Sequence, residues 1–242
     1  MGGVLRYSLA AMILALGMTV SSMLLSRFFV RVKHEEQISV KGYAEAPIVS
    51  DMGELEVRVN VRGERRDKAY QLLTSQVNDI VAKVKQSAPD DLKVGTGNPR
   101  FDEVYKRDSE GNRTNEVEFH TGSQTVSMAS SDVRWVERTG KDLNALIGEG
   151  YDIKVYAPTY LVSRLDDIKR RLLEQATADG YRRAQLMAKN SGARVGSLRA
   201  ARQGVFQITE PNSTETSGYG LYDTSTIAKS IKAVVTLEYD VQ

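Results

Sequence analysis

Apolar and polar residues alternate in two stretches of the chain, which is the pattern of a half-buried β-strand. Residues 38–43 alternate over their first four positions, and residues 55–62 alternate throughout, with four apolar and four polar side chains on opposite faces. Pro47 lies between the two stretches, where its missing backbone donor does least harm. The pattern therefore predicts two extended strands in this part of the chain.

Three later segments repeat their apolar residues every three or four positions, which is typical of amphipathic helices. We predict helices over residues 66–86, 132–147 and 163–190. Ser163 and Asp166 have the spacing of a capping box at the start of the third helix, and Gly192 is expected to end it. The predicted inward-facing residues are Ala69, Leu72, Leu73, Gln76, Val77, Ile80, Val81 and Val84 in the first helix, Val133, Val136, Leu143 and Ile147 in the second, and Ile168, Leu172, Leu173, Ala176, Gly180, Ala184 and Met187 in the third. The small residues of the third helix would let it lie close against a sheet or a partner helix.

Hairpins and helices mix along the rest of the chain, which favours an α+β fold over strict βα alternation. A turn at residues 108–112 separates two predicted strands, and residues 209–226, rich in Ser, Thr and Gly, are expected to form a long mobile loop. Further strands are predicted over residues 93–104, 115–129, 152–163, 195–208 and 231–239. We therefore predict an α+β domain with an antiparallel or mixed sheet, two long helices and one shorter helix.

An uncharged run of twenty residues, Tyr7 to Ser26, precedes these elements. As a helix it would be about 30 Å long, which matches the hydrocarbon core of a bilayer. We predict an N-terminal transmembrane helix that contacts membrane lipid through residues 7–26. The alternative is a cleaved signal peptide, with residues 9–20 as its apolar core and a weak cleavage pattern at residues 20–22. The chain then divides into an anchor with its juxtamembrane segment, residues 1–35, and a folded domain, residues 36–242.

Basic residues beside the run bear on its orientation. Arg27, Arg31 and Lys33 follow the run and outnumber Arg6 and the terminal amine before it, so the positive-inside rule favours a cytoplasmic domain. An outer location of the domain would conflict with this count, and the orientation stays open. Wherever the domain lies, these three side chains are candidates for contact with anionic headgroups, each contributing about 1 kcal/mol.

Composition excludes several classes of protein. The 33 basic and 31 acidic side chains leave a net charge of +2, without the clustered basic excess of a nucleic-acid-binding protein. The chain has no cysteine, so disulfides, thiolate metal sites and cysteine nucleophiles are excluded. Short basic clusters such as Arg182-Arg183 have acids nearby and are expected to be solvated helix faces.

Candidate catalytic groups are sparse. A serine triad or a histidine metal site would have to use His34 or His120, the two histidines of the chain. Neighbours along a strand point to opposite faces, so Asp102 and Glu103 are not expected to share a site. Residues 108–112 lack the spacing of a calcium loop, and no nucleotide-binding motif is present. We predict no catalytic, cofactor-binding or metal-binding residues, and keep as an alternative a hydrolase whose carboxylate pair comes from distant positions.

Several stretches, taken in order, resemble the SIMPL-domain family: Ile38–Ala46, the helix with Ala176, Ala184 and Ala188, Ser191–Leu198 and Ala233–Tyr239. Residues 199–206 resemble a bacterial branch whose members carry an N-terminal hydrophobic anchor. The resemblance covers about residues 37–242. It implies a periplasmic α+β domain held by a single span in the inner membrane, in a family without settled enzymatic chemistry. Some relatives form large ring-like oligomers, and some are linked to envelope or oxidative stress. Residues 106–116 and 209–226 depart from simpler members, which puts in doubt any oligomer contact made there.

These observations together predict a membrane-anchored envelope protein that acts as a homo-oligomer or by binding an envelope partner. Tyr219 and Tyr222 are the predicted contact residues, because aromatic side chains exposed in a loop are enriched where proteins meet. A ligand or stress sensor is a second alternative. It would need a partner to supply the output, since only six residues precede the hydrophobic run.

Overall fold

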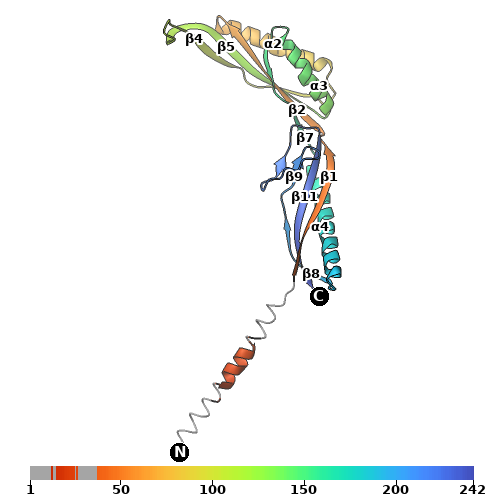
Figure 1. Ribbon diagram of the computed structural model, residues 1–242. Coiled ribbons are helices and arrows are strands. Elements are labelled where there is room, and N and C mark those ends of the chain that lie inside the picture. The colour runs from red at the N-terminus through yellow and green to blue at the C-terminus, as the bar shows by residue number, and fades with distance from the viewer. Residues whose placement is uncertain (1–11, 13–14, 25, 27–36) are drawn as a thin grey trace, which may run out of the picture. The chain divides into compact units, whose positions relative to one another are not determined.

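The computed structural model describes residues 12, 15–24, 26 and 37–242 (Figure 1). Residues 12, 15–24 and 26 are helical. The rest of the predicted membrane run lies outside the described residues, as do His34 and the predicted headgroup contacts Arg27, Arg31 and Lys33. In the described part of the chain, no helix is both long enough and apolar enough to cross a bilayer.

The chain forms two compact units. Unit 1 comprises Met1–Ala44, Leu173–Gly204 and Ala233–Gln242, and unit 2 comprises Glu45–Leu172 and Val205–Lys232. The elements, in chain order, are β1 (Gln37–Val49), β2 (Met52–Gly63), α2 (Arg66–Gln86), β3 (Lys93–Thr96), β4 (Arg100–Arg107), β5 (Arg113–Ser130), α3 (Val133–Asn144), the 3₁₀ turn η1 (Ala145–Ile147), β6 (Asp152–Val155), β7 (Thr159–Leu161), α4 (Leu165–Asn190), β8 (Val195–Gln203), β9 (Gln207–Thr209), β10 (Leu221–Tyr222) and β11 (Ala228–Val241). Most strand pairs are antiparallel, and β9 with β10 is parallel. The predicted α+β class, with two long helices and a shorter one, is confirmed.

The sheet of unit 2 is built around β2 and β5, which pair without interruption from Gly53↔Ser130 to Gly63↔His120. β6 and β7 pair with the other edge of β2, and β3 and β4 pair with β5. The four apolar residues of the predicted strand, Leu55, Val57, Val59 and Val61, are all buried. They face α2 and α3, which lie on the same face of the sheet (Figure 1). The alternation in the sequence therefore identified the core strand correctly.

Helix α2 has the bounds that its apolar period predicts, Arg66–Gln86. Its buried residues are Ala69, Leu73, Val77, Ile80 and Val84. The prediction for Leu72 is wrong, since its side chain is 43% exposed. Successive residues of an α-helix are about 100° apart, so only one of the neighbours Leu72 and Leu73 can point straight at the sheet.

Helix α3 begins where Asp132 accepts a hydrogen bond from the backbone N–H of Trp135 at 2.9 Å. Trp135 is buried on this helix, although its position was not among the predicted inward-facing residues. The prediction for Ile147 is wrong, because it is exposed and Leu146 is buried instead. The chain tightens into η1 at this point, and a 3₁₀ turn advances about 120° per residue, which changes which side chain faces inward.

In unit 1, β11 pairs with β1 on one side and with β8 on the other, and α4 runs along the strands (Figure 1). The buried face of α4 in this unit consists of the small residues Ala176, Gly180, Ala184 and Ala188. A Cβ placed on Gly42 of β1 would lie 2.0 Å from the carbonyl oxygen of Ala176, so helix and strand touch backbone to backbone. The predicted close approach of this helix is confirmed, but Met187 is exposed.

Two strands and one cap differ from the prediction. Residues 93–104 form β3 and β4, and residues 152–163 form β6 and β7 with Pro158 between them, where a strand loses a donor. The predicted capping box at Ser163 is wrong. Its hydroxyl donates to Asp51 Oδ2 at 2.6 Å and its backbone N–H to Asp51 Oδ1 at 2.7 Å, so this serine ties β7 to the start of β2.

Candidate functional site

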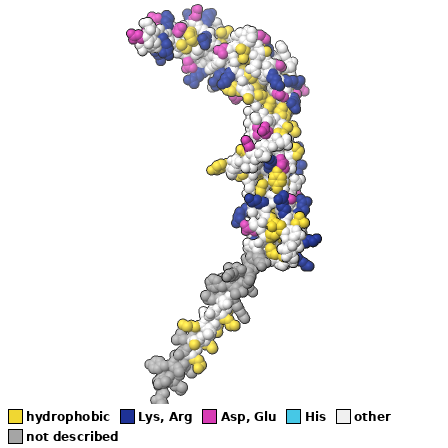
Figure 2. All heavy atoms as spheres, in the orientation of Figure 1, with side chains coloured by type: hydrophobic (Ala, Val, Ile, Leu, Met, Phe, Trp, Pro, Cys, Tyr) yellow, Lys and Arg dark blue, Asp and Glu magenta, His cyan; other side chains and the backbone are white. Residues whose placement is uncertain are grey.

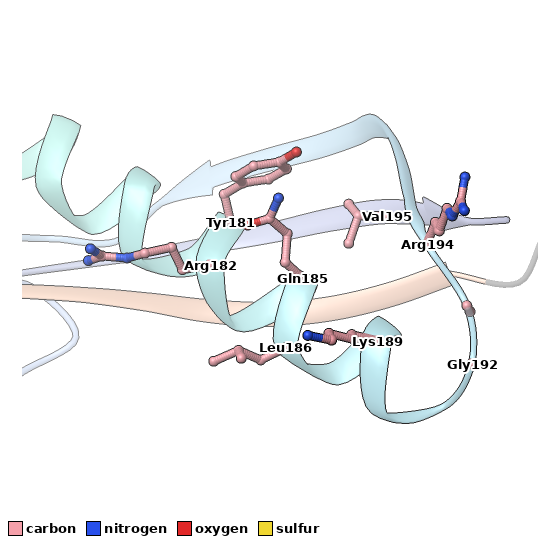
Figure 3. A pocket seen from close by; sticks show the side chains of 9 residues that line it. Tyr181, Arg182, Gln185, Leu186, Lys189, Gly192, Arg194 and Val195 are labelled. Atoms are coloured by element: carbon pink, nitrogen blue, oxygen red, sulfur yellow. The ribbon is translucent and has the colours of Figure 1, made fainter.

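A hollow of about 770 Å³ opens on unit 1 beside the last turns of α4 (Figure 3). Figure 3 shows Tyr181 and Gln185 on the helix side and Arg194 and Val195 on the side that leads into β8. The lining residues are Tyr181, Arg182, Gln185, Leu186, Lys189, Gly192, Ala193, Arg194 and Val195. The five from the helix follow each other at steps of one and three, so they lie on one face of α4, which borders the hollow.

The turn after α4 is held by backbone hydrogen bonds, which gives the hollow a fixed end. Gly192 has a φ of +79°, the left-handed conformation in which glycine commonly ends a helix, as the sequence predicted. The N–H of Ala193 donates to the carbonyl of Ala188 at 2.9 Å. Arg194 and Gln242 then exchange two backbone bonds, of 2.7 and 2.9 Å, which tie the turn to the end of β11.

The charge on the lining is of one sign: three of the nine residues are basic and none is acidic. Among the described residues, Lys189 and Arg194 make no ion pair. Arg182 lies 3.9 Å from Asp179, whose carboxylate is already bonded to Arg183 at 2.7 Å and to the backbone N–H of Tyr43 at 2.9 Å. The bond from Tyr43, together with the nearby arginines, holds the pKa of Asp179 below its ordinary value.

Apolar side chains border the same hollow. Leu186 is 62% exposed, and Tyr181 contacts the ring of Tyr239 at a centroid distance of 5.7 Å. Figure 2 shows hydrophobic side chains beside basic ones at the end of unit 1 that holds β8. The arrangement can bind an anion that carries an apolar portion. The sequence predicted Arg182 to lie on a solvated helix face and gave no signal for Lys189 or Arg194. These two residues line the same hollow because the turn at Gly192 reverses the chain between them.

The predicted contact tyrosines are in different situations. Tyr219 is fully exposed, at the turn before β10. Tyr222 lies in β10, and its hydroxyl accepts a hydrogen bond from the backbone N–H of Val162 at 3.4 Å. Their role in partner contact stays a prediction, but only Tyr219 has a side chain without such an attachment.

The loop that carries these tyrosines is bonded to the strands around it. The side-chain amide of Gln207 in β9 donates to Ser217 O at 2.7 Å and accepts from Ser217 N at 3.3 Å. Lys232 of β11 donates to the carbonyl of Ser213. The segment 209–226, predicted to be a mobile loop, is therefore bonded to β9 through Ser217 and to β11 through Ser213.

A buried ion pair lies beneath the loop in unit 2. The side chain of Lys229 is fully buried, and its Nζ is 3.3 Å from Asp223 Oδ2. Burial alone would raise the pKa of Asp223, but hydrogen bonds from Thr226 and Ser225 and the charge of Lys229 outweigh it and lower the pKa. The sequence contained a signal for this lysine. Lys229 is two residues before Ile231 and four before Ala233, so the alternation of the strand places it on the same buried face.

A second, smaller hollow of about 300 Å³ lies on unit 2 along β4 and β5. Asp102 and Glu103 both border it, together with His120. Their carboxylates nevertheless have separate partners: Asp102 pairs with Arg100 at 3.2 Å, and Glu103 accepts from the hydroxyl of Tyr105 at 2.5 Å. In the described part of the chain, no cluster of three or more His, Cys, Asp or Glu side chains is placed to hold a metal ion.

The fold and these surfaces define an α+β protein with a basic, partly apolar hollow. The sequence matches the family model described as SIMPL, a protein of unknown function (DUF541), over residues 38–239. The chain belongs to the SIMPL family, which confirms the resemblance found in the sequence. No curated protein matches it significantly.

Solved structures give only distant similarity. The de novo designed protein Foldit4 has 19% identity and a TM-score of 0.28, covering 45% of this chain and 96% of its own. An amidase of the hydantoinase/carbamoylase family from Burkholderia phymatum has 17% identity and a TM-score of 0.30, covering 53% of this chain and 34% of its own. A Burkholderia vietnamiensis amidase of the same family has 15% identity and a TM-score of 0.27, covering 52% and 30%. This chain thus spans about a third of the amidase chains, and these TM-scores support no inference about activity.

Proposed function

We propose that this chain is a single-pass envelope protein, anchored through residues 7–26, whose SIMPL domain lies on the outer side of the cytoplasmic membrane and acts by binding a protein partner. Partner binding is supported by the full exposure of the Tyr219 side chain. A fully exposed aromatic side chain projects from a loop that is fixed by hydrogen bonds and a buried ion pair. Tyrosine has only two side-chain torsions, so covering it costs little conformational entropy for a large contact area, and tyrosine is enriched among the residues that contribute most to binding.

The anchoring part is supported by the sequence. Twenty uncharged residues are long enough to span the hydrocarbon core. The basic residues Arg27, Arg31 and Lys33 would favour the opposite orientation, so topology needs a direct test. External protease added to sealed spheroplasts that express the full chain should digest the domain. Protection of the domain, with digestion only after lysis, would contradict the proposed location.

Partner binding is tested by placing a photo-crosslinking amino acid at position 219 of the full chain in membranes. The matched control is position 70, because Tyr70 is also an exposed tyrosine of unit 2, at 54%. We expect an adduct of defined mass from position 219 and none from position 70. An adduct of twice the chain's mass would identify a second copy as the partner, and any other discrete mass an envelope protein. Equal yields at both positions, or no adduct at 219, would refute the assignment of this surface.

A further inference from the structure

We propose that the hollow beside α4 binds the headgroup of an anionic phospholipid in the membrane that anchors the chain. This inference rests on the anchoring part of the proposed function. It depends on three features of unit 1: the position of the hollow, the reach of the chain before β1, and the chemistry of the lining.

The hollow lies at the same end of unit 1 as the beginning of β1. Gly180 of α4 is in contact with Gly42 of β1, with 3.3 Å between a Cβ placed on Gly180 and the Cα of Gly42. From Gly180 the helix runs about 15 Å to Asn190, and from Gly42 the strand runs back about 17 Å to Gln37. Figures 1 and 3 show the two elements running toward the same end. The lining residues of α4 therefore approach the level at which β1 begins.

The reach of the chain keeps this end near the bilayer. Ten residues, 27–36, separate the uncharged run from Gln37. Fully extended, they span at most about 35 Å. If residues 7–26 cross the membrane, the start of β1 lies within about 35 Å of the edge of the hydrocarbon core. The lipid headgroups occupy the first several ångströms beyond that edge. Among the surfaces of unit 1, the hollow is thus held within reach of the lipid headgroups.

The lining suits a phosphodiester joined to an apolar chain. Arg194 offers a planar guanidinium fork that matches phosphate oxygens, and Lys189 adds a second positive charge. Arg182, whose guanidinium also lies 3.9 Å from the Asp179 carboxylate, adds positive charge on the helix side. No carboxylate lines the hollow to repel a phosphate. Leu186 and Tyr181 supply the apolar and amphipathic contacts that are typical of side chains at the bilayer interface. A volume of about 770 Å³ is within the range of sites that hold a small ligand.

The test uses the full chain in nanodiscs of phosphatidylcholine, with or without phosphatidylglycerol. A benzophenone amino acid replaces Leu186, which lines the hollow, or its neighbour Met187, which is 54% exposed but does not line it. After irradiation, mass spectrometry detects lipid adducts. We expect phosphatidylglycerol adducts at position 186, few at 187, and a decrease of about fivefold for each charge removed in the Lys189→Gln and Arg194→Gln variants. Both basic side chains are exposed, so the substitutions should leave the fold intact.

Several results would overturn the proposal. These are equal yields at positions 186 and 187, equal yields with the two lipids, yields that do not change in the charge variants, or a protein adduct at 186 in place of lipid. Inorganic phosphate that abolished the adduct at millimolar concentration would assign the hollow to a free anion, which also contradicts a headgroup site. Co-elution of the chain with nanodiscs reports on the anchor separately. A chain that stays in the discs but shows no lipid selectivity refutes the headgroup site alone.

Discussion

The ion pair between Lys229 and Asp223 permits a quantitative test of how the loop of unit 2 is held. In Asp223→Asn the ammonium of Lys229, whose side chain has no exposed surface, loses its carboxylate partner and keeps only neutral acceptors such as the carbonyl of Thr226. Removing one member of a buried pair costs about 3–5 kcal/mol. We expect the lower end, about 3 kcal/mol, because the side chain of Asp223 is 18% exposed and water can reach the site. Lys229→Met should cost less, since the carboxylate keeps its hydrogen bonds from Ser225 and Thr226.

Urea unfolding of the full chain in mild detergent, followed by the fluorescence of Trp135, measures these changes. Trp135 is the single tryptophan and lies in unit 2 with the ion pair. With a slope of about 2 kcal/mol/M, a loss of 3 kcal/mol lowers the midpoint by about 1.5 M. The double variant should show a coupling energy of about 1–3 kcal/mol. The exposed Lys68→Met serves as the control and should leave the midpoint unchanged.

The same pair predicts a pH dependence. The folded-state pKa of Asp223 lies below its ordinary value of 3.8, so its contribution to stability is present above about pH 4 and is lost as the pH falls further. The difference between the wild-type chain and Asp223→Asn should therefore shrink in acid. The reasoning is refuted if Asp223→Asn unfolds within 0.3 M (about 0.6 kcal/mol) of the wild-type midpoint at neutral pH and the two single changes are additive.

Two further predictions concern other contacts. Gly42→Ala should destabilise unit 1 by about 1–3 kcal/mol or more, because the new Cβ would lie 2.0 Å from a backbone oxygen of α4. Thermal unfolding should therefore show a lowered Tm for this variant. The control Gly97→Ala, whose Cβ would make only a 3.6 Å contact, should match the wild type. Hydrogen bonds from the two serines before α3 lower the pKa of Asp91 from 3.8 to about 2, so its contribution to stability is full above about pH 4 and is lost as the pH falls through 2. Asp91→Asn should flatten the acid-unfolding profile over that range, and Asp90→Asn should not; equal profiles for the two variants would contradict this role of Asp91.

Sequence patterns located the elements better than they located individual contacts. The period of residues 66–86 predicted both ends of α2, because five buried positions repeat along the whole helix. The errors at Leu72 and Met187 are of one kind: a large apolar residue stands next to the residue that faces the sheet. On α4 the reason is visible at Ala176 and Gly180, where β1 lies so close that only small side chains fit the buried face. The distance between two backbones is a property of the folded unit, which a list of apolar positions does not contain.

The candidate sites depend more strongly on tertiary structure. Tyr219 could be predicted to be exposed from the polar composition of its surroundings, but Tyr222 could not be predicted to bond the backbone of Val162, 60 residues away in the chain. The hollow on unit 1 is lined by the end of α4 and by residues 192–195, which lead into β8. The turn at Gly192 places these two segments side by side. Lys189 belongs to α4, and Arg194 follows the turn at Gly192. The lining is therefore uniformly basic only because the folded turn places these two residues beside the same hollow.

The sequence by itself determined the α+β class, the strand and helix periods, the family and the small-residue face of α4, since each follows from local spacing of side chains along one element. Tertiary structure decided which polar groups pair in the interior and which basic side chains line the hollow. Those outcomes depend on how the folded backbone places side chains. The bond from Ser163 to Asp51 joins residues 112 positions apart, and Lys229 is buried against Asp223 because a turn of the chain brings the two together.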